Sequence, residues 1–483
     1  MLHIYPMDFV YNYSTQLIHS INFSHVILQK FFIMPAPIDY AFVFDIDGVL
    51  RYGRGNPVEG ASKTIEFLSE NKIPYVFLTN GGGSERYKEE ELREELSLSD
   101  SIVKKGHIVG SATALFEYAQ FFKNEPILVV GGADSVENAN SIGLSKAVFC
   151  EDVSKQIPDL IPRFTRSDVF CDHCKVEKIS NPILLDENVQ FKAVFVLADP
   201  LNWLTAIEPV TSILTTSGYC HASAVSKLME DRKSFAASPA TCFDPSNPEC
   251  PFYIPPIFFA NSDFTFAGKY PTPRLTMRSL RMCISSITEE RMKETFTTFI
   301  TNETQQVVKG FGSSIESTKS FSEWILRSKI ESFASPLIIQ TGKPHTENFH
   351  GALCRLRSLY PKATSSSPLC HVYMIGDNPH GDIRGANTMR ELGEEMKRKR
   401  IEEGKEDEHC TVTPEWYSML VRTGMMSRFS NPPALTSPVQ EYLEKSDIPT
   451  YECRDVTDCV IYVLEHHGNT ELAEKYKEFI GEK

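Results

Sequence analysis

The stretch that decides the fold is YAFVFDIDGV, residues 40–49, an apolar run followed by two acids one residue apart. The run at 40–44 has the aromatic and β-branched content of a buried parallel strand. In open α/β sheets, ligands gather beyond the carboxyl ends of such strands. Asp45 is therefore a candidate nucleophile toward phosphorus. Asp47, expected on the same side of the pleat, is a candidate for handling the leaving-group proton. On these residues alone, the alternative is a loop in which both acids cap the next helix.

A second apolar run, PYVFL at residues 74–78, ends in Thr79-Asn80-Gly81-Gly82-Gly83. It predicts another buried strand, and its end carries a hydroxyl, an amide and a glycine-rich backbone. Exposed backbone N–H groups bind anionic oxygens, so this segment is a candidate phosphate cradle. A flexible glycine turn is the alternative.

A candidate cation follows the apolar run PLII, residues 336–339, in the segment TGKP at 341–344. Lys343 placed there can neutralise the Asp45 carboxylate and an incoming phosphate together. A single lysine is more often a solvated surface residue, so this segment decides little by itself.

A fourth strand end supplies more acids, where HVYMI at 371–375 is followed by GDNPHGD at 376–382. Mg²⁺ prefers oxygen ligands, few of them carboxylates, with retained waters and substrate phosphate. Asp377 fits as a direct ligand beside Asp45, with Asp382 as a direct ligand or a support. The alternative is a turn in which Asp382 only caps the following helix.

In this order, the four segments resemble the motifs of the haloacid dehalogenase superfamily, and the long interval between the second and third resembles its subfamily IIA. DPLNW at 199–203 and FANSD at 259–263 look like the cat eye syndrome critical region branch of that subfamily. The resemblance implies an α/β fold, with a doubly wound, parallel-sheet, Rossmann-type core and a large inserted α/β cap of the C2 type.

The resemblance also implies a role for each motif residue. Asp45 would be the nucleophile and a Mg²⁺ ligand. Asp47 would be the general acid and base, and its backbone carbonyl would touch the metal. The other implied residues are Thr79, Asn80 and Gly81 for phosphate, Lys343 as the cation, Asp377 and Asp382 for metal, and Asn261 and Asp263 in a cap loop facing the core. A turn after a cap strand is the alternative for the last two. The superfamily's dehalogenases lack an acid at the position of Asp47, which favours phosphoryl chemistry.

Composition agrees with a folded enzyme. The 483 residues are 41% hydrophobic, enough for two or three domains with sizeable cores. A net charge of −14 argues against nonspecific nucleic-acid binding, which needs clustered positive charge. The 12 cysteines are scattered, and Cys171-x-x-Cys174 has no second metal-ligand pair, which favours unpaired thiols over a zinc or redox site.

The motif positions divide the chain into three parts. We expect an N-terminal arm at 1–37, a discontinuous catalytic core at 38–97 and 336–483, and an inserted cap domain at 98–335. In the core we expect helices near 61–71, 85–96, 345–359 and 456–466, another beginning near 380, and a strand at 416–422; in the cap, strands at 127–131, 193–198 and 256–260.

Within the arm at 1–37, the apolar stretch is too short for a membrane span, and polar residues interrupt it. It has no Arg, although transit peptides are Arg-rich, so it is either a targeting segment or a misassigned start. The resemblance implies a mitochondrial location, with a cytoplasmic one as the alternative. Segments 162–188, 230–255 and 391–409 are expected surface insertions.

These expectations together predict a Mg²⁺-dependent phosphatase acting on a small or medium phosphate monoester through an aspartyl-phosphate intermediate. The cap would close over the strand ends, exclude water and select the leaving group. A phosphotransferase or mutase of the same fold is one alternative, and a scaffold or binding protein with little turnover is another. The sequence leaves the leaving group and the oligomeric state open.

Overall fold

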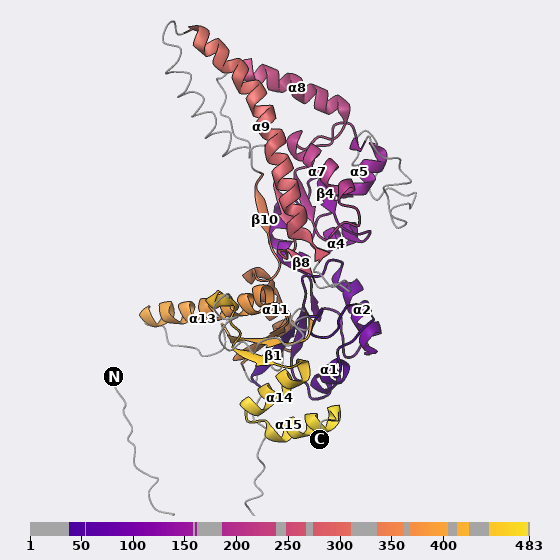
Figure 1. Ribbon diagram of the computed structural model, residues 1–483, viewed down its shortest axis with the longest axis vertical. Coiled ribbons are helices and arrows are strands. Elements are labelled where there is room, and N and C mark those ends of the chain that lie inside the picture. The colour runs from indigo at the N-terminus through magenta and orange to yellow at the C-terminus, as the bar shows by residue number, and fades with distance from the viewer. Residues whose placement is uncertain are drawn as a thin grey trace, which may run out of the picture.

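The computed structural model describes residues 38–53, 55–157, 160–161, 186–237, 248–266, 274–310, 336–361, 368–403, 413–424 and 444–481. Within these ranges, 235–237, 266 and 296–310 are described by their backbone alone. Two parallel sheets lie one above the other along the long axis of the molecule, as Figure 1 shows.

The lower sheet holds the strands that precede three of the four candidate motifs, in the order β13-β12-β11-β1-β2-β3, with every neighbouring pair parallel. The strands are β1 (Tyr40–Phe44), β2 (Tyr75–Leu78), β3 (Ile108–Val109), β11 (His371–Gly376), β12 (Glu415–Val421) and β13 (Tyr451–Cys453). Its helices are α1 (Ala61–Glu70), α2 (Glu85–Leu96), α11 (Thr346–Leu359), α13 (Arg384–Glu402), α14 (Val456–His466) and α15 (Thr470–Ile480), with a π-helical turn at Pro379–Ile383 and a 3₁₀ turn at Lys445–Asp447.

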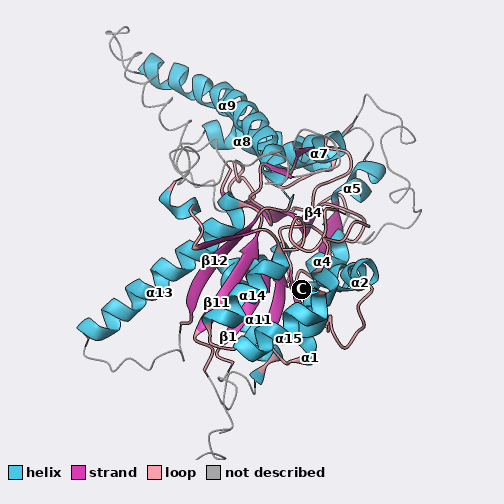
Figure 2. Cartoon of the chain, turned by 60° about the horizontal axis from the view of Figure 1, so that its bottom comes forward, coloured by secondary structure: helices cyan, strands magenta, loops and turns pink. Residues whose placement is uncertain are grey.

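Helices cover both faces of this sheet (Figure 2) because both faces of β1 are apolar. Tyr40, Phe42 and Phe44 pack in a cluster with residues of α1, α14 and α15. Ala41 and Val43 point the other way, into a cluster with residues of α11 and α13. The sheet is therefore doubly wound, and the predicted fold class is confirmed.

The upper sheet has the order β10-β7-β6-β4-β5 and is also parallel. Its strands are β4 (Ile127–Val130), β5 (Ala147–Phe149), β6 (Ala193–Val196), β7 (Ile257–Phe259) and β10 (Ile338–Gln340), around one apolar core. Around it lie a 3₁₀ turn at Ser111–Leu115, α3 (Phe116–Phe121), α4 (Ser135–Ser141), α5 (Cys150–Gln156), α7 (Leu204–Thr215), α8 (Ala222–Ala237), α9 (Met277–Gly310) and the hairpin β8 (Thr265–Phe266) and β9 (Arg274–Leu275).

The expected helices and strands are present within a few residues of their predicted bounds. Strand pairing nevertheless crosses the expected domain boundaries in two places. Residues 108–109, which fall in the expected cap, form the short strand β3 and pair with β2. Strand β10, which falls in the expected core, pairs with β7. Pairing between strands far apart in the chain decides sheet membership, so an apolar run alone does not reveal it. The short strands β3, β5, β8, β9 and β13, of two or three residues each, were not predicted.

Several expectations concern residues outside the described ranges. These are the arm at 1–37, most of the insertion at 162–188 with Cys171 and Cys174, and parts of the insertions at 230–255 and 391–409. The described parts of the last two include α8 through residue 237 and α13 through residue 402. Segment 248–255 is also described, and because Phe252, Tyr253 and Ile254 are buried there, the expectation of a surface insertion is wrong for this part. Among the helices of the described ranges, none combines the length and apolar character needed to cross a membrane.

Candidate active site

The carboxyl ends of strands from both sheets meet at one junction. Asn261, which follows β7, donates through Nδ2 to the backbone oxygen of Asn80, which follows β2, at 3.1 Å. Near the end of β4, a carboxylate oxygen of Asp134 accepts from the backbone N–H of Ser84 at 3.0 Å. The predicted strand-end residues of core and cap are therefore brought together between the two sheets.

A buried lysine joins two carboxylates at the centre of this junction. Lys343 Nζ lies 2.6 Å from Asp45 Oδ1 and 2.6 Å from Asp382 Oδ1. It also donates to the backbone oxygen of Leu78, the last residue of β2, at 3.1 Å. Lys343 thus contacts the ends of β1, β2 and β11, as expected, although it follows β10, a strand of the upper sheet.

Burial and mutual charge set the protonation of this cluster. Burial raises the pKa of Asp45 to about 7, against the opposing effect of the Lys343 ammonium. Burial also opposes the charge of Lys343, but the Asp382 and Asp45 carboxylates outweigh it and raise the pKa of the ammonium above its usual range. Lys343 is therefore a permanent cation here at physiological pH.

The predicted metal ligands form a compact set of oxygen donors. Carboxylate oxygens of Asp45, Asp377 and Asp382, all buried, lie within 4.8 Å of one another. The backbone leaves room for Asp377 only because its neighbours are glycines: a Cβ on Gly48 or on Gly424 would lie 2.1 Å from Asp377 Oδ2. Hard carboxylate oxygens in this number suit Mg²⁺, so the residues present fit that ion.

Asp47 lies apart from this cluster. Its side chain is 51% exposed, and Oδ1 accepts from Arg51 Nε at 2.8 Å. Because β1 ends at Phe44, the strand pleat that was expected to place Asp45 and Asp47 on one side does not extend to either residue. The two side chains therefore differ in burial, and the predicted metal contact through the Asp47 carbonyl stays a prediction.

Arg51 is a site residue that the sequence did not reveal. Its guanidinium is 4% exposed and bridges from Asp47 to two acids of α2, Glu95 and Glu91, the latter at 3.3 Å. A lone arginine three residues beyond the DxDG motif carries no signal of this contact, because the partners on α2 lie far along the chain.

The predicted phosphate loop is ordered by its own side chains. Thr79 Oγ1 accepts from the backbone N–H of Gly81 at 2.9 Å. A Cβ on Gly81 would lie 3.3 Å from Lys88 Nζ, so a second buried cation lies beside the loop. Asn80 Oδ1 accepts from the backbone N–H of Lys343 at 2.7 Å, and this hydrogen bond joins the loop to the segment that carries Lys343.

The predicted cap loop reaches the core through side-chain hydrogen bonds. Asn80 Nδ2 donates to Asp263 Oδ2 at 2.9 Å, and Ser262 Oγ donates to the Lys343 carbonyl at 2.6 Å. Burial raises the pKa of Asp263 to about 6, opposed by the hydrogen bond from Asn80. Asn261 and Asp263 are therefore brought to the site as predicted, and Ser262 joins them.

Thr423 and Gly424 complete the junction and were missed. Thr423 Oγ1 donates to the Gly48 carbonyl at 2.5 Å, and Gly424 flanks the Asp377 carboxylate. Both directly follow the predicted strand at 416–422, so the reasoning that selected the other strand ends would also have found them.

The site segments coincide with matches to known families. Residues 42–145 match the sequence profile of haloacid dehalogenase-like hydrolases, and residues 340–389 match a second profile of HAD-hydrolase-like proteins. A mitochondrial hydrolase of Saccharomyces cerevisiae is 26% identical over 436 residues, covering 89% of this chain and 96% of its own length.

Two phosphatases show more distant similarity. An acid sugar phosphatase of Staphylococcus epidermidis is 26% identical over 106 residues, or 22% of this chain and 39% of that protein. The crystal structure of a possible sugar phosphatase from Cytophaga hutchinsonii has a TM-score of 0.42 at 14% identity, over 86% of this chain and 94% of that one. The two profile matches confirm the resemblance to the superfamily, and the branch within subfamily IIA stays a prediction.

Proposed function

The chain is a haloacid dehalogenase-like hydrolase, and from this premise we propose that it is a Mg²⁺-dependent phosphatase of small or medium phosphate monoesters. The observation that carries the proposal is the position of Lys343 Nζ, 2.6 Å from both Asp45 and Asp382 at the carboxyl ends of the core strands. In this arrangement the Asp45 carboxylate can act as a nucleophile, and the buried Lys343 cation reduces its repulsion from an anionic substrate.

Asp45 is the proposed nucleophile. One of its carboxylate oxygens forms a bond to phosphorus as the ester P–O bond breaks, which leaves an aspartyl phosphate and an alkoxide. Asp47 gives the leaving oxygen its proton. Water then attacks phosphorus while Asp47 takes a proton from it, the bond between phosphorus and the Asp45 oxygen breaks, and inorganic phosphate departs from the restored Asp45 carboxylate. Dividing hydrolysis into two displacements is the general use of a carboxylate nucleophile.

The charge of the phosphate must be screened at the moment of attack. Lys343 supplies one buried positive charge next to Asp45. Thr79, Asn80 and Gly81 supply donors for phosphoryl oxygens at the end of β2. Asp45, Asp377 and Asp382 would hold Mg²⁺, which would add positive charge between the nucleophile and the phosphate.

The substrate class follows from the position of the cap. Asn261, Ser262 and Asp263 contact Asn80 and Lys343, so the cap covers the reacting end of the substrate. This favours a small ester over a phosphorylated folded protein. The similarity to an acid sugar phosphatase supports the same class, and the name of the yeast relative supports a mitochondrial location.

The test compares purified wild-type protein with Asp45→Asn on a panel of phosphate esters in Mg²⁺. We expect Asp45→Asn to fold and to lose turnover, because the change is nearly isosteric and removes the attacking charge. Asp458→Asn, which alters a helix-surface carboxylate paired with Arg454, is the matched control and should retain full activity. Acid-quenched wild-type protein should carry phosphate on the peptide that contains Asp45.

The outcomes separate the candidate functions. Equal release of alcohol and inorganic phosphate supports hydrolysis, whereas transfer of the phosphoryl group to an added alcohol in preference to water would identify a phosphotransferase. A folded Asp45→Asn protein with wild-type turnover would reject Asp45 as the nucleophile.

A further inference from the structure

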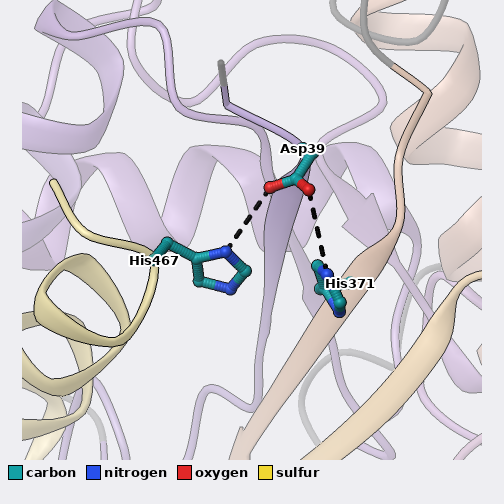
Figure 3. A group of neighbouring side chains, drawn as sticks. All are labelled: Asp39, His371 and His467. Atoms are coloured by element: carbon teal, nitrogen blue, oxygen red, sulfur yellow. Dashed lines mark ion pairs between the residues drawn. The ribbon is translucent and has the colours of Figure 1, made fainter. Parts of the chain in front are cut away.

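A second group of metal-type side chains lies at the opposite end of the core sheet. Asp39, His371 and His467 face one another, as Figure 3 shows, and one ligand atom from each lies within 4.8 Å of the others. Asp39 directly precedes β1, whereas Asp45 directly follows it. Six residues of extended chain span about 20 Å, so this group is remote from the proposed catalytic centre.

The separations between the Asp39 carboxylate and the two histidine rings are longer than those of ordinary charge-assisted hydrogen bonds. Asp39 Oδ1 lies 3.4 Å from His467 Nδ1, and Asp39 Oδ2 lies 3.8 Å from His371 Nε2. Hydrogen bonds between a protonated imidazole and a carboxylate are shorter, about 2.7–2.9 Å. In the described part of the chain, neither carboxylate oxygen of Asp39 has a hydrogen bond to either ring.

The 3.4 Å separation between Asp39 Oδ1 and His467 Nδ1 fits two donors around one cation, and the 3.8 Å separation between Asp39 Oδ2 and His371 Nε2 would have to shorten when the ion binds. Zinc bonds of about 2.1 Å in a tetrahedral site place neighbouring ligand atoms about 3.4 Å apart. An octahedral ion with the same bond length would bring them to about 3.0 Å. Two imidazoles and one carboxylate are also a donor set that Zn²⁺ accepts, with a fourth position left for water.

Hydrogen bonds hold the His467 ring and the backbone next to Asp39 and His371 in place. His467 Nε2 lies 2.8 Å from the hydroxyl of Tyr373, so the nitrogen that faces away from Asp39 has a partner. Ligating histidines commonly use their second nitrogen in this way. The backbone oxygen of Asp39 accepts from the N–H groups of Cys370 and His371, at 2.7 and 3.1 Å, which fixes the starts of β1 and β11 together.

The His371 ring is the side chain of this group that hydrogen bonds constrain least. Its Nδ1 is buried and has no hydrogen-bond partner among the described residues, and its Nε2 has only Asp39 at 3.8 Å. Hydrogen bonding therefore does little to orient this ring, and a coordinate bond at Nε2 would do so.

We propose that Asp39, His371 and His467 bind a Zn²⁺ ion at the amino ends of β1 and β11. The side chains of Asp39 and His371 are 30% and 27% exposed, so the ion would reach the site from solvent and keep a water ligand. Bound there, zinc would connect the C-terminal end of α14, through His467, to the first residues of the two central strands. Its role is structural, separate from the magnesium chemistry at the opposite end of the sheet.

The experiment measures Zn²⁺ binding by full-length protein after chelator treatment, in excess Mg²⁺ so that the carboxylate site between the sheets does not compete. A Cys171→Ser/Cys174→Ser background removes the one closely spaced thiol pair. Co²⁺ serves as a second probe, because its visible absorption distinguishes tetrahedral from octahedral coordination. The variants are Asp39→Asn, His467→Gln and Tyr373→Phe. His466→Gln is the matched control, since His466 adjoins the group and is not one of its ligands.

We expect wild-type protein and His466→Gln to bind Zn²⁺ equally, to give a tetrahedral Co²⁺ spectrum and to melt at higher temperature with zinc. Asp39→Asn and His467→Gln should lose binding, and Tyr373→Phe should bind about tenfold more weakly. Zinc binding by folded His467→Gln equal to that of wild type would overturn the proposal. An octahedral Co²⁺ spectrum in wild type would do the same. Circular dichroism establishes folding, and the wild-type spectrum tests the geometry even if Asp39→Asn does not fold.

Discussion

Replacing Lys343 by methionine should destabilise the protein in a manner that depends on pH and on Mg²⁺. The methionine keeps most of the stem and removes the ammonium that lies 2.6 Å from Asp45 and 2.6 Å from Asp382. Removing one partner of a buried ion pair costs about 3–5 kcal/mol, because the other charge stays buried without compensation. Two carboxylates lose their partner here, so we expect the upper end of that range above neutral pH.

The pH dependence follows from the direction of the Asp45 shift. Burial already raises the pKa of Asp45 from 3.8 to about 7, and losing Lys343 removes the group that opposes this. A carboxyl whose folded pKa exceeds its unfolded value binds more protons when folded, so stability falls as pH rises through that window. The penalty of Lys343→Met should therefore be small at acid pH, where Asp45 is protonated in both folded proteins, and should grow as the pH rises above about 7, where Asp45 ionises beside Lys343 only in the wild type.

The assay is urea unfolding of wild type and Lys343→Met in EDTA and in Mg²⁺, near about pH 5 and about pH 8. Mg²⁺ should recover part of the loss at the higher pH, because it brings positive charge back to the three carboxylates. Lys399→Met, which removes an exposed lysine of α13 paired with Glu395, is the control and should unfold like wild type. A Lys343→Met protein as stable as wild type at both pH values would refute the reasoning.

Three further predictions address the site. Gly48→Ala should reduce Mg²⁺ affinity by at least about tenfold, because the added Cβ would lie 2.1 Å from Asp377 Oδ2. The control is Gly53→Ala, also at positive φ but with no atom within 4 Å, which should show only backbone strain of about 1–2 kcal/mol. Equal Mg²⁺ affinities of the two variants, measured by calorimetry, would contradict this prediction. Arg51→Met should slow hydrolysis of alkyl phosphates more than of nitrophenyl phosphate, because a mispositioned Asp47 matters most for a leaving group that needs a proton; equal loss on both esters would mean that Arg51 acts only through the fold. Activity should disappear in EDTA and return with Mg²⁺ but not with Zn²⁺, as a phosphate-release assay will show, and full activity in EDTA would exclude the proposed metal.

The sequence by itself predicted most of the candidate site residues, because they belong to a recognisable local pattern. An apolar run followed by polar residues marks a strand end, and parallel strands bring such ends to one edge of a sheet. That rule selected Asp45, Thr79 and Asp377, and it applies equally to Thr423 and Gly424. The doubly wound sheet was predicted from the family resemblance, and the apolar character of both faces of β1 is the physical reason that helices lie on both sides.

Only the tertiary structure decided which of the side chains at these strand ends contact one another. Lys343 follows a strand of the upper sheet, and only the pairing of β10 with β7 shows that this lysine lies at the junction of the two sheets. Arg51, which pairs with Asp47, is itself held by two acids of α2, and Asp39 meets His371 and His467; these contacts join segments far apart in the chain. No local pattern contains such contacts, because they depend on strand order and helix packing, and these are established only when distant segments bury their apolar faces together.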